Sequence, residues 1–354
     1  MGKGQTMSYK TLYIKTTGSC NLDCKHCFTG GKGGDKTHFN PEKTAQWVKD
    51  YIEATPDAVN YHLELHGGEP FLVPVAKLKQ FVDHFKDNPK ITIGANTNLT
   101  YKLTDEILDF IQTYLGSSIG TSWDPWIRWA NDKQYQLWLN NMKRLRSLNV
   151  SLYTIVSVSK RMTEQTPDWL LDQLATTGAT TVSLERLTLS GNAERNPDVF
   201  PDNEAQDYWY LELVKRYRER KADLPYNIRT LDTLIEKVNL GIVKTDTNCR
   251  NCEQNLVTIN SNGTLGGCPN VASEHKHATL DDSVQTFLVS DGRVNEIVKE
   301  LNFNDPCYYC DVFDICGGDC HRLPWQGDRC GGLKHTLRYL SGRVTDSNII
   351  LKVR

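Results

Sequence analysis

Cys20-Asn21-Leu22-Asp23-Cys24-Lys25-His26-Cys27 is the stretch that decides which fold and chemistry the rest of this sequence has to support. It places three cysteines in the spacing C-x3-C-x2-C, directly after the apolar run 12–14. Three thiolates so close together can surround one iron–sulfur cluster, and a cubane [4Fe–4S] cluster takes four ligands. With three protein ligands, one iron stays open to a small chelating molecule. A zinc knuckle or a buried group of cysteines is the alternative that the motif alone leaves open.

Length and composition limit the class of protein. The 354 residues accommodate one large domain plus a small one, or two to three average domains. The net charge of −2 gives no indication of a partner. No apolar run approaches the length of a membrane span, and residues 1–5 lack the apolar core of a signal peptide. We therefore expect a cytoplasmic monomer without membrane contact.

The chain contains 11 cysteines, which is a high count. Without a signal peptide, metal or cluster ligation explains them better than disulfides do. The number also divides into one set of three and two sets of four, which corresponds to one open cluster and two fully ligated ones. The cysteines fall into an N-terminal and a C-terminal group: Cys20, Cys24, Cys27, then Cys249, Cys252, Cys268, Cys307, Cys310, Cys316, Cys320, Cys330.

Between about residues 10 and 224, β-rich runs alternate with amphipathic helical patterns. Strands are predicted at 11–15, 59–65, 90–95, 119–123, 151–158 and 180–184. Helices are predicted from Asn40-Pro41 onward and at 75–85, 104–115, 133–148, 167–177 and 203–220. Six such repeats predict an α/β fold, a partial (β/α)6 TIM-like barrel at 1–225 with catalytic groups after the strand ends. A helical linker (226–248), a small Cys-rich domain (249–335) and a basic tail (336–354) are expected to follow.

The second predicted strand leads into His66-Gly67-Gly68-Glu69-Pro70. The two glycines allow the backbone to approach a ligand closely, and Glu69 can accept hydrogen bonds from an amino group. The three-cysteine loop and this G-G-E-P motif together resemble the radical S-adenosylmethionine (radical SAM) superfamily.

This resemblance implies an oxygen-sensitive enzyme. The cofactor would bind the open iron of the cluster held by Cys20, Cys24 and Cys27, and G-G-E-P would hold its amino group. An electron from the cluster, supplied by a donor such as flavodoxin or ferredoxin, would cleave a C–S bond. The resulting 5′-deoxyadenosyl radical would abstract a hydrogen atom from the substrate.

The same resemblance assigns further cofactor contacts. His26 would lie beside the adenine, and Asn96, Ser122 and Asp124 would contact the ribose or the carboxylate. Family members often contain S-x-D-G-P, whereas this chain has Ser122-Trp123-Asp124-Pro125 without the glycine. Ser122 and Asp124 capping a helix is the alternative.

The C-terminal cysteines resemble the seven-cysteine signature of the SPASM extension, C-x(9–15)-G-x4-C, a gap, C-x2-C-x5-C-x3-C, a gap and C. All seven positions match, as does Gly263, which lies in a hairpin-turn pattern. The resemblance implies two auxiliary [4Fe–4S] clusters and thus three in total. The first would be held by Cys249, Cys252, Cys268 and Cys320, and the second by Cys307, Cys310, Cys316 and Cys330. Cys249 lies outside the signature and is assigned as the remaining cysteine. Two four-thiolate zinc sites are the alternative.

SPASM proteins mostly modify peptides or proteins, so the resemblance implies an oxidoreductase that acts on a peptide or protein side chain. Sulfatase maturation is disfavoured, because Cys268-Pro269-Asn270 lacks the aspartate that serves there as a base. The first strand begins about 10 residues from Met1, which we expect to leave no room for a leader-peptide-binding domain. Glu185 and Arg186 follow the sixth strand and either face the pocket or form an ordinary surface ion pair.

A nucleoside- or nucleobase-modifying enzyme is the second hypothesis, such as a phage-type thymidine hypermodification isomerase acting on an amino-acid-modified base in DNA. Trp123, Trp126 and Trp129 would stack a base, although core packing is the more common role of such residues. A basic segment would meet phosphates, or be a solvated tail. Its cations are Arg322, Arg329, Lys334, Arg338, Arg343, Lys352 and Arg354. A purely structural or electron-transfer cluster protein is a third class, against which the open iron argues.

Overall fold

The structure is a computed structural model that describes residues 8–241, 250–271 and 276–343. Its first part alternates strands and helices, as predicted. The strands are β1 (Ser8–Thr17), β2 (Ala58–Gly67), β3 (Ile91–Ala95), β4 (Ser118–Ser122), β5 (Ser151–Val158), β6 (Thr181–Arg186) and β7 (Asn227–Ile228). The helices are α1 (Pro41–Ala54), α2 (Val75–Val82), α3 (Asp105–Tyr114), α4 (Asp132–Ser147), α5 (Lys160–Thr163), α6 (Pro167–Thr177), α7 (Asn192–Arg195), α8 (Asn203–Arg220) and α9 (Arg229–Leu240).

The helix starts follow from local capping. Asn40 caps α1 by accepting a hydrogen bond from the backbone N–H of Lys43, with Pro41 as the first helical residue. Thr104 caps α3 in the same way through Ile107. Because these signals lie within four residues of each other in the sequence, the helix starts could be predicted without tertiary information.

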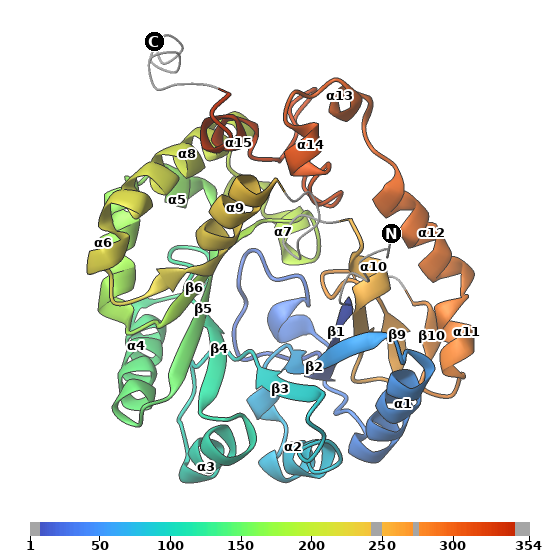
Figure 1. The fold of residues 1–354 in the computed structure, drawn as a ribbon. Helices are drawn as coiled ribbons and strands as arrows, with labels where there is room; N and C mark the ends of the chain where they lie inside the picture. Colours follow the sequence, from blue (N-terminus) through green and yellow to red (C-terminus); the bar gives the residue numbers. More distant parts are fainter. Residues whose placement is uncertain (1–7, 242–249, 272–275, 344–354) are drawn as a thin grey trace.

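Strands β1 to β6 are all parallel and follow one another in space, which confirms the predicted partial barrel. β1, β2 and β3 pair in one sheet, β4, β5 and β6 in a second, and a parallel bridge between Asn96 and Gly120 joins the two. Figure 1 shows these strands in the centre with the helices outside them. The predicted linker (226–248) departs from expectation where it is described, because β7 pairs with β6 and α9 packs against β6.

The Cys-rich region closes the gap that the partial barrel leaves. It comprises α10 (Cys252–Asn255), β8 (Leu256–Ile259), β9 (Thr264–Gly266), β10 (Ala278–Thr279), α11 (Val284–Leu288), α12 (Asp291–Leu301), α13 (Asp305–Tyr308), α14 (Phe313–Cys316) and α15 (Lys334–Leu340). The predicted hairpin is present as β8 and β9, and β8 also pairs in parallel with β1. The region runs from α11 beside α1 to α15 beside α8 (Figure 1). The basic tail predicted from residue 336 therefore begins inside a packed helix, and residues 344–354 lie outside the described part.

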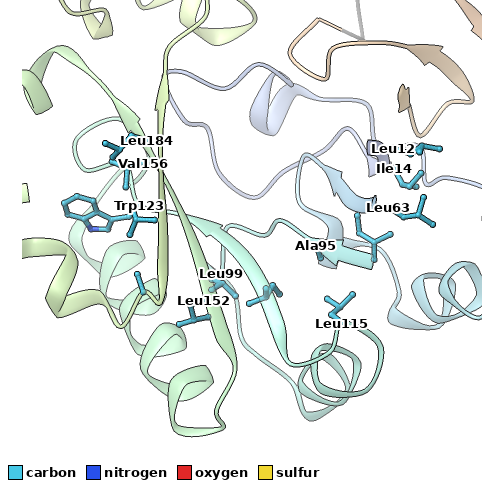
Figure 2. Packing of buried hydrophobic residues seen from close by; sticks show 14 of the residues in the cluster. Leu12, Ile14, Leu63, Ala95, Leu99, Leu115, Trp123, Leu152, Val156 and Leu184 are labelled. Atoms are coloured by element: carbon cyan, nitrogen blue, oxygen red, sulfur yellow. The ribbon is translucent and has the colours of Figure 1, made fainter. Parts of the chain in front are cut away.

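Buried aliphatic side chains fill the space between the strands and the surrounding helices (Figure 2). Leu12, Leu63 and Leu152 are fully buried, and burial of each such side chain contributes about 1.5–3 kcal/mol. This packing makes the strands a rigid platform for the loops that follow them. Within the described ranges, each helix is too short or too polar to span a lipid bilayer.

Candidate active site

The loop of residues 20–27 follows β1, and the segment after β6 holds it in place. Cys24 is buried, Cys20 and Cys27 are half-buried, and all three are free thiols. The backbone N–H of Asn192 donates to the carbonyl of Cys27 (2.7 Å), and its side-chain amide donates to the carbonyl of Cys24 (2.9 Å). The three predicted cluster ligands thus lie on a loop that is fixed at its cysteine-bearing turn.

The chemistry of these thiols fits a cluster. Burial raises the pKa of Cys20 to about 11 and that of Cys24 to about 12, so both stay protonated at neutral pH without a metal. A bound metal centre removes this proton outright. In the described ranges no three His, Cys, Asp or Glu side chains are arranged to hold a single metal ion.

The two glycines of the G-G-E-P motif bring the end of β2 against the start of the cysteine loop. A Cβ on Gly67, whose φ is +134°, would lie 2.2 Å from the carbonyl oxygen of Thr17. A Cβ on Gly68 would lie 2.1 Å from that of Ser19. The backbone N–H of Glu69 donates to the same Ser19 carbonyl (2.9 Å). Only glycine fits this close approach, which places Glu69 beside the cysteine loop.

Glu69 is fully buried and serves as an acceptor for three donors. Its Oε1 accepts from the N–H of Phe71 (3.1 Å) and the hydroxyl of Thr97 (2.7 Å), and its Oε2 accepts from the N–H of Asn98 (2.7 Å). A carboxylate accepts about four hydrogen bonds, so one site remains for a ligand N–H. Burial raises the pKa of Glu69 to about 7, although these donors oppose the shift.

His26 belongs to a buried charge network at the end of β4. Asp124 is fully buried and accepts from Arg128 Nε (2.7 Å) and from the N–H of Ser157 (2.5 Å), while His26 Nε2 lies 3.3 Å from its Oδ2. Burial opposes ionisation of Asp124, but Arg128 and His26 outweigh it and hold the pKa of this carboxyl below its usual range. The oxygens of Asp124 are thus engaged by protein groups. Asp124 would therefore help to bind a nucleoside only indirectly, by orienting the ring of His26. The buried Nδ1 of His26 has no partner in the described structure.

Asn96 and Ser122 lie at the ends of neighbouring strands, as predicted. Asn96 forms the bridge between β3 and β4, and its side-chain oxygen is buried without a partner among the described residues. Ser122 is the last residue of β4 and is half-buried. Their contact with the cofactor stays a prediction.

Two further residues complete this site and were not among the predicted ones. Asn98 donates from its side-chain amide to Cys20 Sγ (3.4 Å), while its backbone N–H binds Glu69. Arg128 donates to Asp124 and lies near Cys24 in the buried network. The spacing of Asp124 and Arg128, four residues apart, signals such a pair on a helical turn. No local pattern signals the contact of Asn98 with a cysteine 78 residues away.

The C-terminal cysteines gather in two places. One cavity of about 260 Å³ is lined by the four cysteines predicted for the second auxiliary cluster (Cys307, Cys310, Cys316 and Cys330) and also by Cys320, which was predicted for the first. Burial is the main reason that the pKa of Cys268 is raised, and Cys320 lies close enough to raise it further. Their proximity agrees with the predicted crossover of Cys320 to the first cluster. Cys249, the fourth predicted ligand there, lies outside the described residues.

The tryptophans and basic residues considered for nucleic-acid binding contact other side chains of the protein, where they are described. Trp126 stacks on Trp169 (5.4 Å between ring centroids), Trp123 is buried beside it, and Trp129 packs on Trp138 (5.3 Å). The described basic residues of the C-terminal segment form ion pairs: Arg322–Glu296, Arg329–Glu204, Lys334–Asp311, Arg338–Asp311 and Arg343–Asp314. Lys352 and Arg354 lie outside the described residues.

Comparisons with known proteins agree with this arrangement. Residues 2–115 match the model of a 4Fe-4S single cluster domain. The structure is similar to that of anSMEcpe with bound AdoMet and Cp18Cys peptide, with 17% identity, a TM-score of 0.73 and coverage of 89% of this chain and 90% of that one. It is also similar to Streptococcus suis SuiB bound to S-adenosylmethionine, with 14% identity, a TM-score of 0.62 and coverage of 88% of this chain and 73% of that one. For SuiB bound to the precursor peptide SuiA, the identity is 15%, the TM-score 0.60 and the coverage 88% of this chain and 72% of that one. No curated protein sequence matches the chain.

The predicted fold is thereby confirmed, both by its parallel strands and by its likeness to these solved structures. The chain has the fold of these solved structures, a partial barrel that the Cys-rich region completes, and its residues 2–115 match a 4Fe-4S domain.

Proposed function

We propose that the protein is a radical SAM enzyme with two auxiliary clusters that oxidises a peptide or protein side chain. The observation that carries this proposal is the position of Asn98, which joins the two halves of the predicted cofactor site. Its side chain donates to Cys20 Sγ, and its backbone N–H donates to Glu69. A cluster ligand and an acceptor for an amino group are therefore held side by side.

When bound, the cluster and S-adenosylmethionine supply the reductive C–S cleavage that makes a 5′-deoxyadenosyl radical, with an electron from a flavodoxin or ferredoxin. The residues of the chain position the reactants for this step. Cys20, Cys24 and Cys27 would hold the cluster, and Glu69 would accept from the amino group of the cofactor. The buried packing of β1, β2 and β4 keeps these groups in register, which lowers the entropy cost of bringing them together.

A peptide substrate is supported by two observations. AnSMEcpe and SuiB, whose folds are similar, have been solved with peptides bound. The basic residues and tryptophans that would have met a nucleic acid are engaged in ion pairs and packing in the described chain. Binding of duplex DNA that strengthens steeply at low salt would contradict this choice and favour the nucleobase alternative.

The decisive experiment is reductive turnover of S-adenosylmethionine. The protein would be reconstituted with iron and sulfide without oxygen, reduced with dithionite, and assayed for 5′-deoxyadenosine and methionine. We expect both products from the wild type and neither from Cys24→Ala, whereas Cys310→Ala should still form them. Absence of both products from a fully reconstituted wild type would overturn the proposal.

A further inference from the structure

A second cavity lies where the barrel meets the Cys-rich region. Its volume is about 300 Å³, and it is lined by residues from β6, α8, α9 and the segments around residues 270 and 320. Ser183, Glu185, Tyr210, Thr230 and Asn270 are among them. None of the three cysteines of the N-terminal loop lines it, whereas Cys320, a predicted ligand of the first auxiliary cluster, does.

The wall of this cavity is fixed by hydrogen bonds. The hydroxyl of Thr230 accepts from the backbone N–H of Leu184 (2.9 Å) and lies 2.9 Å from the hydroxyl of Ser183. Asn270 donates to the hydroxyl of Thr188 across the cavity (3.1 Å). The segment that follows β6 then carries Asn192, which holds the cysteine loop. A group bound in this cavity would therefore have a defined position relative to that loop.

Arg186 and Asp319, which both line this cavity, neutralise each other. Arg186 forms a two-pronged ion pair with Asp319, with both N–O distances at 2.7 Å, and also donates to the carbonyl of Gly331 (2.6 Å). Both side chains are largely buried. The pair joins β6 to the Cys-rich region and adds no net charge to the cavity.

Glu185 is the other charged side chain that lines this cavity. It is exposed there. Among the described residues it has neither a hydrogen bond nor an ion pair. Burial raises its pKa, Arg186 lowers it, and Asp124 adds a smaller rise. Asp124 is itself neutralised by Arg128.

Three phenols lie near Glu185 and carry no charge. Its carboxylate contributes to raising the pKa of Tyr13, Tyr153 and Tyr210, for each of which burial is the largest cause. The phenols therefore stay protonated, and they can donate hydrogen bonds without compensating the charge of Glu185.

We propose that Glu185 binds a cationic group of the substrate, a primary ammonium or a guanidinium. A carboxylate forms its strongest hydrogen bonds with cationic donors, and the adjacent cation, Arg186, is already paired with Asp319. Because Glu185 has neither a hydrogen bond nor an ion pair among the described residues, its carboxylate is open to a cationic group of a ligand in this cavity. The inference rests on the proposed function in one respect: it takes this cavity to be the part of the active site that receives the peptide. It then names the substrate class as a peptide with a lysine, an arginine or a free amino terminus at this position.

Matched tripeptides test this assignment by binding alone. Acetyl-Ala-X-Ala-amide, with X as lysine, arginine, norleucine or glutamate, would be titrated into the reconstituted holoprotein at low salt without oxygen. We expect the lysine or arginine peptide to bind about tenfold more tightly than the norleucine peptide, as loss of one charged hydrogen bond implies. The glutamate peptide should bind most weakly.

Variants locate the preference. Glu185→Gln keeps the shape and removes the charge, so it should bind the lysine and norleucine peptides equally. Glu185→Asp should retain a reduced preference. Glu106→Gln, at an exposed glutamate on α3, is the matched control and should behave as the wild type. Iron content and circular dichroism would show that each variant is folded and loaded.

Two results would overturn the assignment: no preference for the cationic peptides in the wild type, or an unchanged preference in Glu185→Gln. Formation of 5′-deoxyadenosine without peptide is measured separately in the same preparations. Its absence from the wild type would contradict the proposed function while leaving the assignment of Glu185 to be decided by the binding data.

Discussion

Replacing Glu69 with glutamine tests the cofactor site most directly, because the change alters one buried charge and almost no volume. In the wild type this carboxylate accepts from the N–H of Phe71, the hydroxyl of Thr97 and the N–H of Asn98. Glutamine keeps one oxygen and replaces the other by an N–H2 donor. If the oxygen faces Phe71 and Thr97, the new donor faces the N–H of Asn98, and that buried group loses its acceptor.

The expected loss follows from these contacts. A hydrogen bond to a charged group contributes about 1.5–3 kcal/mol, so removal of the ionised acceptor should weaken S-adenosylmethionine binding roughly 10- to 150-fold at pH 8. The buried N–H of Asn98 without an acceptor should also lower the free energy of unfolding by about 1–3 kcal/mol.

The change of the S-adenosylmethionine dissociation constant with pH provides a second quantity to measure. Burial raises the pKa of Glu69 to about 7. Only the ionised form offers both oxygens as acceptors, so protonation competes with cofactor binding below this pH. The dissociation constant of the wild type should therefore be about tenfold higher at pH 6 than at pH 8. Glu69→Gln has no such proton and should show a flat profile.

Equilibrium binding of S-adenosylmethionine to the reconstituted protein at several pH values would measure both effects. Glu64→Gln is the matched control, because Glu64 lies on β2, the strand that leads to Glu69, and is also buried, but its carboxylate is paired with His62 (2.6 Å). We expect its dissociation constant to equal that of the wild type. A Glu69→Gln constant within twofold of the wild type at pH 8, or a wild-type constant that does not vary from pH 6 to pH 8, would refute the role of Glu69.

Three further predictions concern the clusters and the contact between the two regions. Cys24→Ala should lower the iron content from about twelve to about eight per chain, on three four-iron clusters, and abolish cleavage of S-adenosylmethionine; an unchanged iron content would contradict the assignment. Cys310→Ala should lose the same amount of iron but retain cleavage and lose peptide modification, and full retention of iron would show that the second auxiliary cluster is misplaced. Arg186→Met leaves Asp319 buried without its cation, so it should lower the free energy of unfolding by about 3–5 kcal/mol; a denaturant midpoint equal to that of the wild type would show that the pair is not formed.

The barrel could be predicted from the sequence because its signals are local. A β-rich run, a cap and an apolar helical stripe each occupy a few consecutive residues, as at Asn40 and Thr104. The three cysteines and the G-G-E-P motif belong to the same class of signal. Their positions after β1 and β2 followed once the parallel order of strands was assumed, because the C-terminal ends of parallel strands lie on one side of the barrel.

Contacts between distant segments could be decided only by the tertiary structure. Arg186 and Asp319 are 133 residues apart, and no property of either residue distinguishes an ion pair across two regions from an ordinary surface pair. The same holds for Asn98, which joins Glu69 to Cys20. Helix α15 likewise appears in the sequence as a basic tail, because its packing against α8 depends on residues more than 100 positions earlier.

The 20–27 loop and the G-G-E-P motif were sufficient to predict a cluster and a cofactor site, because each pattern occupies a few consecutive residues. The surroundings of Glu185 were determined by folding alone. Its neighbours come from β1, β5 and α8, and its adjacent arginine turns away to Asp319. A carboxylate is available to a ligand only when no neighbouring group pairs with it. For Glu185 those neighbours come from distant parts of the chain, so only the tertiary structure decides whether it is paired.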